Sequence, residues 1–239
     1  MAKPKYRRIL LKLSGEVLAG EDGFGINPKK ASYLAKEVKS IHDLGISIGL
    51  IIGAGNIFRG IQAASKGMDR VTGDYLGMLA TIMNAIAVQD ALEKINCETR
   101  TLSAINIAQI AEPYIRRRAI RHLEKGRIVI VAGGTGNPFF TTDSAAALRA
   151  KELNADIVIK GTKVNGVYDK DPISNPDAVK YDTLSHSLVL NKNLRVMDLT
   201  AITLCKENNL PIHVFDINGS GFLKEIVLGS KIGTLVTED

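Results

Sequence analysis

Short apolar runs that each end at a glycine turn constrain the fold of this chain more than any other feature of its sequence. The runs are residues 9–11, 48–52 and 128–132, and the turns that follow contain Gly15, Gly53 and Gly133. The runs are apolar at almost every position, which is typical of parallel strands with helices on both faces. Ligands gather where the carboxyl ends of parallel strands share one edge of a sheet. Three glycine junctions at that edge therefore predict a nucleotide site.

Strand and helix signals alternate along the chain. Strands are expected at residues 8–13, 47–52, 98–102, 128–132, 157–160 and 212–215. Helices are expected at residues 28–44, 73–95, 115–125, 142–153, 198–208 and 221–228. This order predicts the α/β class, as a three-layer α/β/α sandwich with a mainly parallel central sheet. No repeat, low-complexity tract or linker divides the chain, so a single domain over residues 1–239 is expected.

The 239 residues carry a net charge of +6, which is compatible with a nucleic-acid partner. Stacking side chains are scarce, however: the chain has no Trp, and aromatic residues make up 5% of it. The densest basic patch is Arg116, Arg117, Arg118 and Arg121, which share an apparent helix with apolar residues. We interpret it as a solvated or subunit-facing helix surface. A positive balance also suits an enzyme whose substrates are polyphosphates.

The cysteines and the N-terminus indicate a cellular compartment. Cys97 and Cys205 lie far apart and fit no metal-binding spacing, so two buried free thiols in a reducing cytoplasm are expected. The basic N-terminus leads into only a short apolar strand, which does not match a signal peptide. No apolar run approaches the roughly 20 residues that a membrane helix needs. These patterns predict a cytoplasmic protein without a membrane segment.

The third junction continues through a hydroxyl-rich loop to an acid at the start of a helix. Thr135, Thr141 and Thr142 supply the hydroxyls, and Asp143 follows them. Backbone N–H groups, hydroxyls and a helix N-terminus around one point are how proteins hold phosphate. Asp143 then has two interpretations: it complements the helix dipole, or it orients a lysine or a metal ion.

The first two junctions bring cations to the same edge. Lys12 lies at the end of the first strand beside Ser14 and Gly15, placed to span phosphates that the glycine lets the backbone approach. Arg59 follows the second junction, and an arginine can grip a phosphate with two hydrogen bonds. The chain has neither a Walker A pattern nor a G-x-G-x-x-G motif after its first strand. Phosphoryl transfer, which needs charge neutralisation and alignment more than a protein nucleophile, remains open.

Two further features are ambiguous from the residues alone. Asp74 precedes a long helix and is either an acceptor for a sugar hydroxyl or an acid favoured by the helix dipole. Residues 160–172 offer turns, the ring of Tyr168 and carboxylates, as a clamp for a base and a ribose would. The long loop from residue 161 to 181 is either a binding loop or merely solvated. The four histidines lie outside the glycine junctions and are expected to be structural or exposed.

Taken in order, several of these segments resemble bacterial UMP kinases (uridylate kinases) of the amino-acid kinase superfamily. The segments are residues 12–16 (KLSGE), 20–25, 55–60 (GNIFRG), 73–81 (GDYLGMLAT), 136–143, 163–172 and 196–198 (VMD). The resemblance implies the amino-acid kinase fold and a homohexamer. It also implies transfer of the γ-phosphoryl group of ATP to UMP in pyrimidine nucleotide biosynthesis, with Mg²⁺ bridging the donor phosphates and no protein side chain binding the metal directly.

The resemblance also implies a role for each matching residue. The catalytic residues would be Lys12, Arg59 and Asp143, with Asp143 organising lysines. ATP would contact Lys12, Leu13, Ser14, Gly15, Gly55, Arg59, Thr162, Tyr168 and Asp171. UMP would contact Ala54, Asp74, Thr135, Gly136, Asn137, Pro138, Phe139, Phe140, Thr141 and Thr142. GTP would activate through Gly20, Glu21, Asp22, Gly23, Phe24 and Gly25, and UTP would inhibit.

Three departures from the family and two alternatives remain. Asn165 stands where Asp is common, Gly161 stands where Ala is common, and the third departure is at Ala54. The family usually has three glycines where this chain has Gly53-Ala54-Gly55, so Ala54 is expected to have φ below zero. The first alternative keeps the fold and changes the acceptor, as in an acyl-phosphate-forming glutamate or acetylglutamate kinase; residues 77–81 and 135–143 speak against it. The second is a nucleotide- or nucleic-acid-binding regulator without catalysis, which the net charge of +6 supports.

Overall fold

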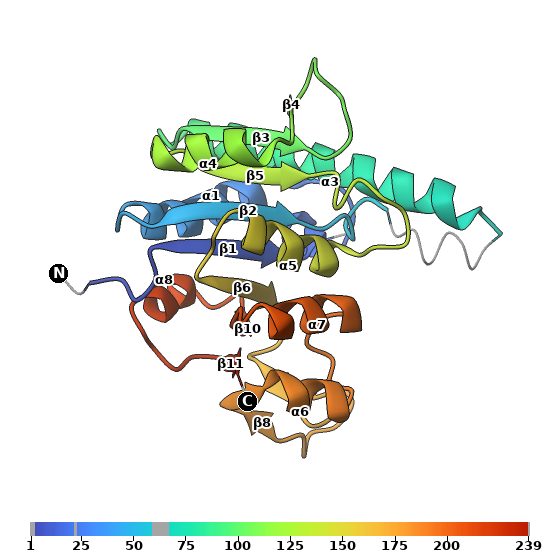
Figure 1. Cartoon of the computed structure of the whole chain (residues 1–239), viewed down its shortest axis with the longest axis vertical. Helices are drawn as coiled ribbons and strands as arrows, with labels where there is room; N and C mark the ends of the chain where they lie inside the picture. The colour runs from blue at the N-terminus through green and yellow to red at the C-terminus, as the bar shows by residue number, and fades with distance from the viewer. Residues whose placement is uncertain (1–2, 22, 59–66, 239) are drawn as a thin grey trace.

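A nine-stranded sheet runs through the residues that this computed structural model describes, which are 3–21, 23–58 and 67–238 (Figure 1). Its strands are β1 (Arg8–Leu13), β2 (Ser47–Ile52), β3 (Thr99–Ser103), β4 (Glu112–Pro113), β5 (Ile128–Ala132), β6 (Ile157–Thr162), β9 (Thr183–Ser185), β10 (Ile212–Asp216) and β11 (Thr234–Thr237). They lie in the order β4-β3-β5-β2-β1-β6-β10-β11-β9. All neighbours are parallel except β10 and β11. A separate ribbon pairs β7 (Val167–Tyr168) with β8 (Lys180–Tyr181).

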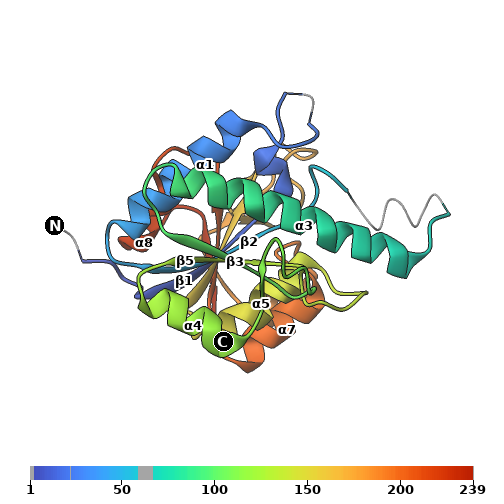
Figure 2. The same ribbon diagram turned by 90° about the horizontal axis from the view of Figure 1, so that it is seen from above.

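Helices cover both faces of this sheet, as Figure 2 shows from above. On one face lie α1 (Pro28–His42), α3 (Arg70–Glu93) and α8 (Phe222–Val227), and on the other lie α4 (Arg116–Glu124), α5 (Thr142–Glu152) and α7 (Leu199–Glu207). The 3₁₀ helix η1 (Gly15–Leu18) follows β1, and α6 (His186–Asn191) packs against α7. The predicted three-layer α/β/α sandwich is confirmed.

The two helical layers explain why the strands are apolar at successive positions. Along β1, Ile9, Leu11 and Leu13 belong to the core on the α1 and α3 side, whereas Leu10 belongs to the core under α5 and α7. All four are fully buried. Successive side chains of a strand point to opposite faces, so a strand between two helical layers needs apolar residues on both.

The predicted boundaries agree closely for the long elements. The bounds of β1, β2 and β5 are as predicted, and β3 is displaced by one residue. The six expected helices are all present, with ends that differ from the prediction by at most three residues. The sequence did not predict η1, β4, β7, β8, β9, β11 or α6. These elements span two to six residues, too few to establish a periodic pattern.

Helix α3 corrects the expectation that no apolar run approaches the length of a membrane helix. It has 24 residues, and an 18-residue window in it has a mean hydropathy of 1.3, so by length and composition it could cross a membrane. In this fold 44% of that window is buried, and α3 lies across the sheet beside α1 (Figure 2). A helix that supplies Ile82, Ala85, Val88 and Leu92 to the core needs that hydropathy for packing.

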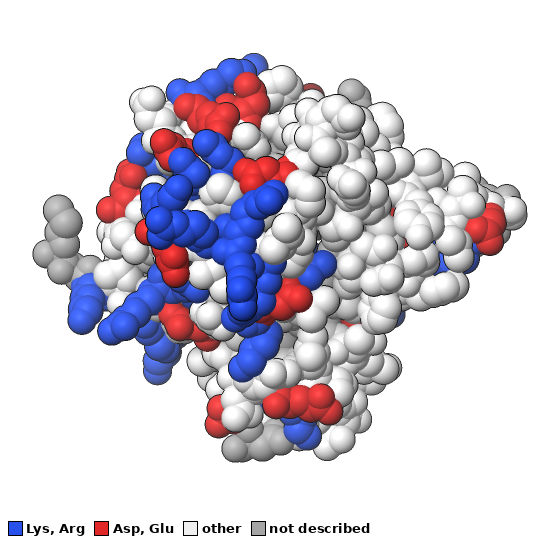
Figure 3. Space-filling model, turned by 45° about the horizontal axis from the view of Figure 1, so that its top comes forward, with Lys and Arg blue, Asp and Glu red and all other residues white. Residues whose placement is uncertain are grey.

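The basic patch lies on α4 and its surroundings. Figure 3 shows Lys and Arg gathered on one face with Asp and Glu among them. Arg118 lies 3.7 Å from Glu112, and Arg121 lies 3.6 Å from Glu124. These acidic residues form ion pairs with the arginines and so interrupt the positive surface. This arrangement fits a solvated helix surface better than a continuous anion-binding track.

Both thiols and the histidines take the structural places expected of them. Cys97 and Cys205 are buried and free. Nε2 of His213 lies 2.6 Å from the carbonyl oxygen of Ile232, and burial is the main reason that its pKa is lowered. His42 Nε2 lies 2.8 Å from the carbonyl oxygen of Gly126. These rings serve local structure at a distance from the glycine junctions.

Candidate functional site

The three glycine junctions lie side by side because β5, β2 and β1 are neighbours in the sheet. The backbone N–H of Gly53 donates to the carbonyl oxygen of Leu13 at 2.9 Å, which ties the second junction to the first. A Cβ on Gly15 would lie 2.4 Å from the carbonyl oxygen of Gly53, and one on Gly53 would lie 3.4 Å from Oγ1 of Thr142. Gly15 is thus required by a close backbone approach, and the junctions form one surface.

Two lysines and one aspartate form an ion-paired group below this surface. Lys12 Nζ lies 2.5 Å from Asp143 Oδ1, and Lys160 Nζ lies 2.9 Å from Asp143 Oδ2. Lys12 and Lys160 are direct partners in the parallel pairing of β1 and β6, so the sheet register brings both ammonium groups to one carboxylate. The three side chains are 9%, 14% and 15% exposed for Lys12, Lys160 and Asp143. We refer to them as the Lys–Asp–Lys group.

The charges in this group shift its pKa values. Burial would raise the pKa of the Asp143 carboxyl, but attraction to Lys12 and Lys160 outweighs burial and holds that pKa below its ordinary value. Burial lowers the pKa of Lys160, and repulsion from Lys12 adds to this against the attraction of Asp143. Asp143 therefore stays ionised at neutral pH and orients the lysines. It is poorly suited to act as a general base, because both oxygens already face an ammonium group.

Thr141 and Asp198 fix the place of Asp143. Thr141 is the N-cap of α5, and its Oγ1 accepts hydrogen bonds from the backbone N–H groups of Asp143, at 3.0 Å, and Ser144, at 3.3 Å. The Thr141 hydroxyl donates in turn to Asp198, and the Ser144 hydroxyl does so at 2.9 Å. Asp198 also caps α7 by accepting from Ala201 N at 2.8 Å. One carboxylate thus links the starts of α5 and α7.

A pocket of about 170 Å³ opens between the second and third junctions. Six of the residues predicted to contact UMP line it, namely Ala54, Asp74, Thr135, Phe140, Thr141 and Thr142, and so does Gly55. Ala54 is absent from the described residues with positive φ, as expected. Gly136, Asn137, Pro138 and Phe139 belong to the same loop but do not line the pocket.

The loop between β5 and α5 is held against α3. Asp74 accepts from the backbone N–H of Phe139 at 2.7 Å and from Nε of Arg70 at 2.9 Å. At the other end of the loop, Gly133 N–H donates to Oγ1 of Thr81 at 2.9 Å. Asp74 therefore joins the loop to the first turns of α3, a role in addition to the predicted contact with a sugar hydroxyl.

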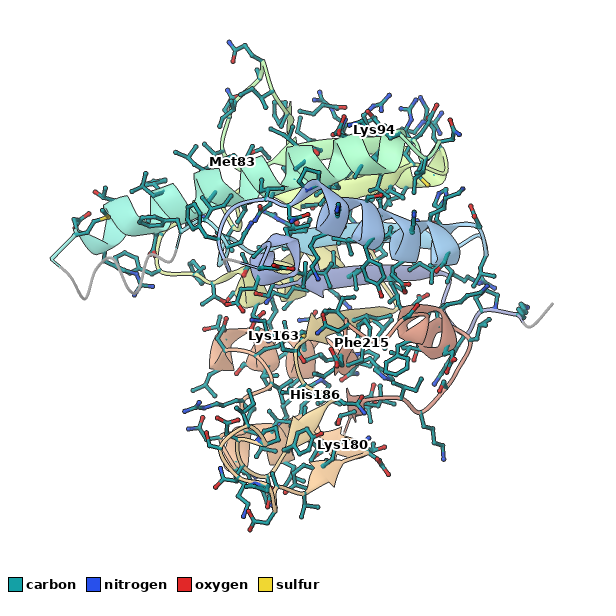
Figure 4. All side chains as sticks on the ribbon, turned by 180° about the vertical axis from the view of Figure 1, so that it is seen from behind. Met83, Lys94, Lys163, Lys180, His186 and Phe215 are labelled. Carbon is teal, nitrogen blue, oxygen red and sulfur yellow. The ribbon has the colours of Figure 1, made fainter. Side chains whose placement is uncertain are left out.

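A second pocket, of about 490 Å³, lies beyond β6. Two residues of the predicted adenosine site, Tyr168 and Asp171, line it together with the cations Lys192 and Arg195. Thr162, the third, does not line it; its hydroxyl donates to the carbonyl oxygen of Val164 at 2.7 Å and so shapes the turn leading there. Lys163, labelled in Figure 4, lies 2.6 Å from Glu16 and connects this turn to η1.

The described part of the segment predicted to respond to GTP is bonded to the turn after β2. Gly23 N–H donates to the carbonyl oxygen of Gly20 at 3.1 Å, and Gly25 N–H donates to that of Asn56 at 2.8 Å. Phe24 is 68% exposed, and Glu21 is also exposed. The predictions for Asp22 and Arg59 fall outside the described residues.

Lys160 and Asp198 are site residues that were not predicted from the sequence. Lys160 is a strand-end lysine like Lys12, but only the order β1-β6 shows that the two face one carboxylate. The sequence therefore contains the lysine at the strand end, but it does not show that this strand lies next to β1. Asp198 precedes a helix, a position that the sequence also gives to ordinary caps.

Residues 7–216 match the model of the amino acid kinase family. A UMP kinase from Bacillus anthracis is 43% identical with a TM-score of 0.94, over 98% of this chain and 97% of that one. A UMP kinase from Ureaplasma parvum is 36% identical with a TM-score of 0.91, over 98% and 100% of the two chains.

A more distant solved structure has the same architecture. A uridylate kinase from Archaeoglobus fulgidus is 28% identical with a TM-score of 0.74, over 96% of this chain and 99% of that one. The family model covers most of the chain, and the first two structures share more than a third of its residues. The chain belongs to the amino acid kinase family.

Proposed function

We propose that this protein is a UMP kinase, which transfers the γ-phosphoryl group of ATP to UMP and yields ADP and UDP. The observation that carries the proposal is the Lys–Asp–Lys group at the edge where the three glycine junctions meet. Two ammonium groups share one carboxylate, so the group has an excess of one positive charge. A buried positive excess calls for an anionic partner, and a polyphosphate supplies it.

The pocket between the second and third junctions suits the acceptor. Threonine hydroxyls, the N-terminus of α5 and the carboxylate of Asp74 line a space next to Asp143. UMP would place its phosphate toward Thr142 and the start of α5, where N–H groups favour an anion. Its ribose would lie toward Asp74. The solved UMP kinases that this chain resembles support the choice of acceptor.

The donor would enter from the β6 side. Tyr168 and Asp171 would contact the adenosine, and the phosphates would run over Ser14, Gly15 and Gly55 to Lys12 and Lys160. Lys12 and Lys160 would neutralise charge on the transferring group, while Asp143 keeps their ammonium groups in place. Arg59 is proposed from the sequence alone as a further phosphate contact.

We propose Mg²⁺ as the cofactor, held by the donor phosphates. Both oxygens of Asp143 already contact ammonium groups, and the charge of these two lysines disfavours a metal ion at that position. When bound, the ion would offset negative charge between the β- and γ-phosphates.

The finer parts of the proposal concern regulation and context. We propose activation by GTP through residues 20–25, inhibition by UTP, and a role in pyrimidine nucleotide biosynthesis in the cytoplasm, with residues 1–239 acting as one domain. UMP titrations with and without GTP and UTP test the regulation; identical curves would contradict it.

We also propose a homohexamer, supported by an apolar stripe on α3. Tyr75, Leu76, Leu79, Met83 and Ile86 recur at helical spacing and are 37% to 53% exposed. The protruding end of α3 is largely free of charge in Figure 3, and Figure 4 labels Met83 on this helix. Apolar side chains contiguous on one face favour contact with another copy.

The acceptor prediction is tested by ADP release from ATP with UMP, CMP, glutamate or acetylglutamate. UMP is expected to give the highest kcat/KM, because the pocket offers hydroxyls, N–H groups and one acid for a phosphorylated sugar. Turnover with an amino acid and none with UMP would establish the acyl-phosphate alternative instead.

Asp143→Asn is expected to lower kcat at least about 100-fold, the scale typical of losing a preorganised charge contact. Binding of ADP, measured calorimetrically, should persist because the glycine junctions remain. Asp43→Asn is the matched control: it breaks an exposed ion pair with Lys39 at 2.9 Å and should leave kcat unchanged. Equal rates for Asp143→Asn and the unaltered protein would contradict the assignment.

The lowered pKa of Lys160 predicts a pH dependence. The ammonium loses its proton as pH rises, so kcat should decline with rising pH. The midpoint of this decline should lie at a pH below the ordinary lysine pKa of about 10.4. In Lys160→Arg the guanidinium keeps its charge above pH 12, roughly, and the decline should move to higher pH. Circular dichroism at each pH checks that both proteins stay folded; an unmoved decline would show that Lys160 does not titrate in the reaction.

Met83→Glu is expected to reduce the assembly, because a carboxylate in an apolar contact must be desolvated. Light scattering should show six chains for the unaltered protein and fewer for the variant. Val179→Glu places the same charge at a side chain that is 62% exposed away from α3, and should keep the hexamer. An unchanged mass for Met83→Glu would contradict the proposed interface.

A further inference from the structure

Two buried amide side chains face each other beneath the first two junctions. Asn56 lies in the turn after β2, and Asn84 lies in the middle of α3; they are 1% and 0% exposed. Asn56 Nδ2 donates to Asn84 Oδ1 at 2.9 Å, and Asn84 Nδ2 donates to Asn56 Oδ1 at 2.8 Å. A buried amide that loses its partner pays the full cost of desolvation, so the pair fixes the positions of the groups bonded to it.

The remaining amide hydrogens reach two separate segments. Asn56 Nδ2 also donates to the carbonyl oxygen of Gly25 at 2.7 Å, and Asn84 Nδ2 also donates to that of Gly53 at 2.7 Å. The N–H of Gly25 returns a bond to the carbonyl oxygen of Asn56 at 2.8 Å. Gly25 is therefore held through both of its backbone groups, and Gly53 is held from α3.

The first junction contacts the side-chain amide of Asn56. A Cβ on Gly15 would lie 2.3 Å from Oδ1 of Asn56, so the backbone of Gly15 touches the side-chain oxygen directly. Gly25, the 53–55 turn, Gly15 and α3 thus meet at two side chains. A fully satisfied buried network of this kind is rigid, because moving one member leaves another without its partner.

We propose that Asn56 and Asn84 are positioning residues that hold the donor-phosphate turn and Gly25 as one unit. This inference rests on the proposed function, in which Gly15 and Gly55 face the phosphates of ATP. Nucleotide at the turn restrains Gly25 through Asn56. A change at residues 20–25, or a shift of α3 in an assembly, reaches the turn through the same two amides.

Hydrogen exchange on the unaltered protein gives the first test. Addition of ADP is expected to slow exchange in the peptide that carries Gly25, although Phe24 and Glu21 face solvent. Slowing confined to the glycine junctions would overturn the coupling. Failure of ADP to bind at all would instead contradict the proposed function, so the two failures are distinguishable.

Asn84→Ala and Asn56→Asp give the second test, with melting curves to confirm folding. Asn84→Ala removes the bond to Gly53, and Asn56→Asp removes the donor to Gly25 at almost unchanged volume. In Asn84→Ala the calorimetric dissociation constant of ADP should rise about tenfold, which corresponds to about 1.4 kcal/mol. That of UMP should change less than threefold or so, since the hydroxyls of its pocket do not bond to the pair. In Asn56→Asp the ADP-induced slowing at Gly25 should be lost.

Asn208→Ala is the matched control, because its amide donates to the carbonyl oxygen of Leu204 at 2.9 Å on α7, away from the junctions. It should leave both dissociation constants and the slowing at Gly25 as they are. Equal weakening of ADP and UMP by Asn84→Ala, or ADP-induced slowing that persists in Asn56→Asp, would show that the pair only stabilises the fold. Should either variant fail to fold, the exchange measurement on the unaltered protein decides the matter.

Discussion

The sharing of one buried carboxylate by two lysines is the interaction on which the site depends. Charges this far from water must be paired or they lose their charge, and Asp143 is the partner of both Lys12 and Lys160. Each side chain comes from a different element: β1, β6 and the first turn of α5. The group therefore exists only when the parallel register of β1 and β6 and the N-cap of α5 are both in place. The excess positive charge of the group then favours the binding of phosphate.

Much of this could be predicted from the sequence, because the long elements carry their own signals. Continuous apolar runs in β1, β2 and β5 predicted strands covered on both faces, and α1 begins at Pro28 as predicted. The glycine after each strand marked the ligand edge without any knowledge of strand order. Gly15 in particular is explained by its approach to the carbonyl oxygen of Gly53.

What could not be predicted depends on contacts between distant residues. Lys160 gains its importance from lying opposite Lys12, and Asn84 from facing Asn56, 28 positions earlier in the chain. Asp198 joins α5 and α7 through hydroxyls more than 50 positions away. The edge strand β9 and its neighbour β11 have three and four residues; the pairing of β11 with β10 and of β9 with β11, rather than periodicity, makes them strands. Local patterns contain none of this information.

The central claim is that charge and position, without a protein nucleophile, transfer the phosphoryl group between two bound nucleotides. The most direct measurement is the stereochemical course of transfer to UMP from an ATP analogue made chiral at its γ-phosphorus with oxygen isotopes and sulfur. A single in-line transfer inverts the configuration, and the Lys–Asp–Lys group predicts inversion. Retention would require two transfers through a phosphorylated side chain and would contradict this account.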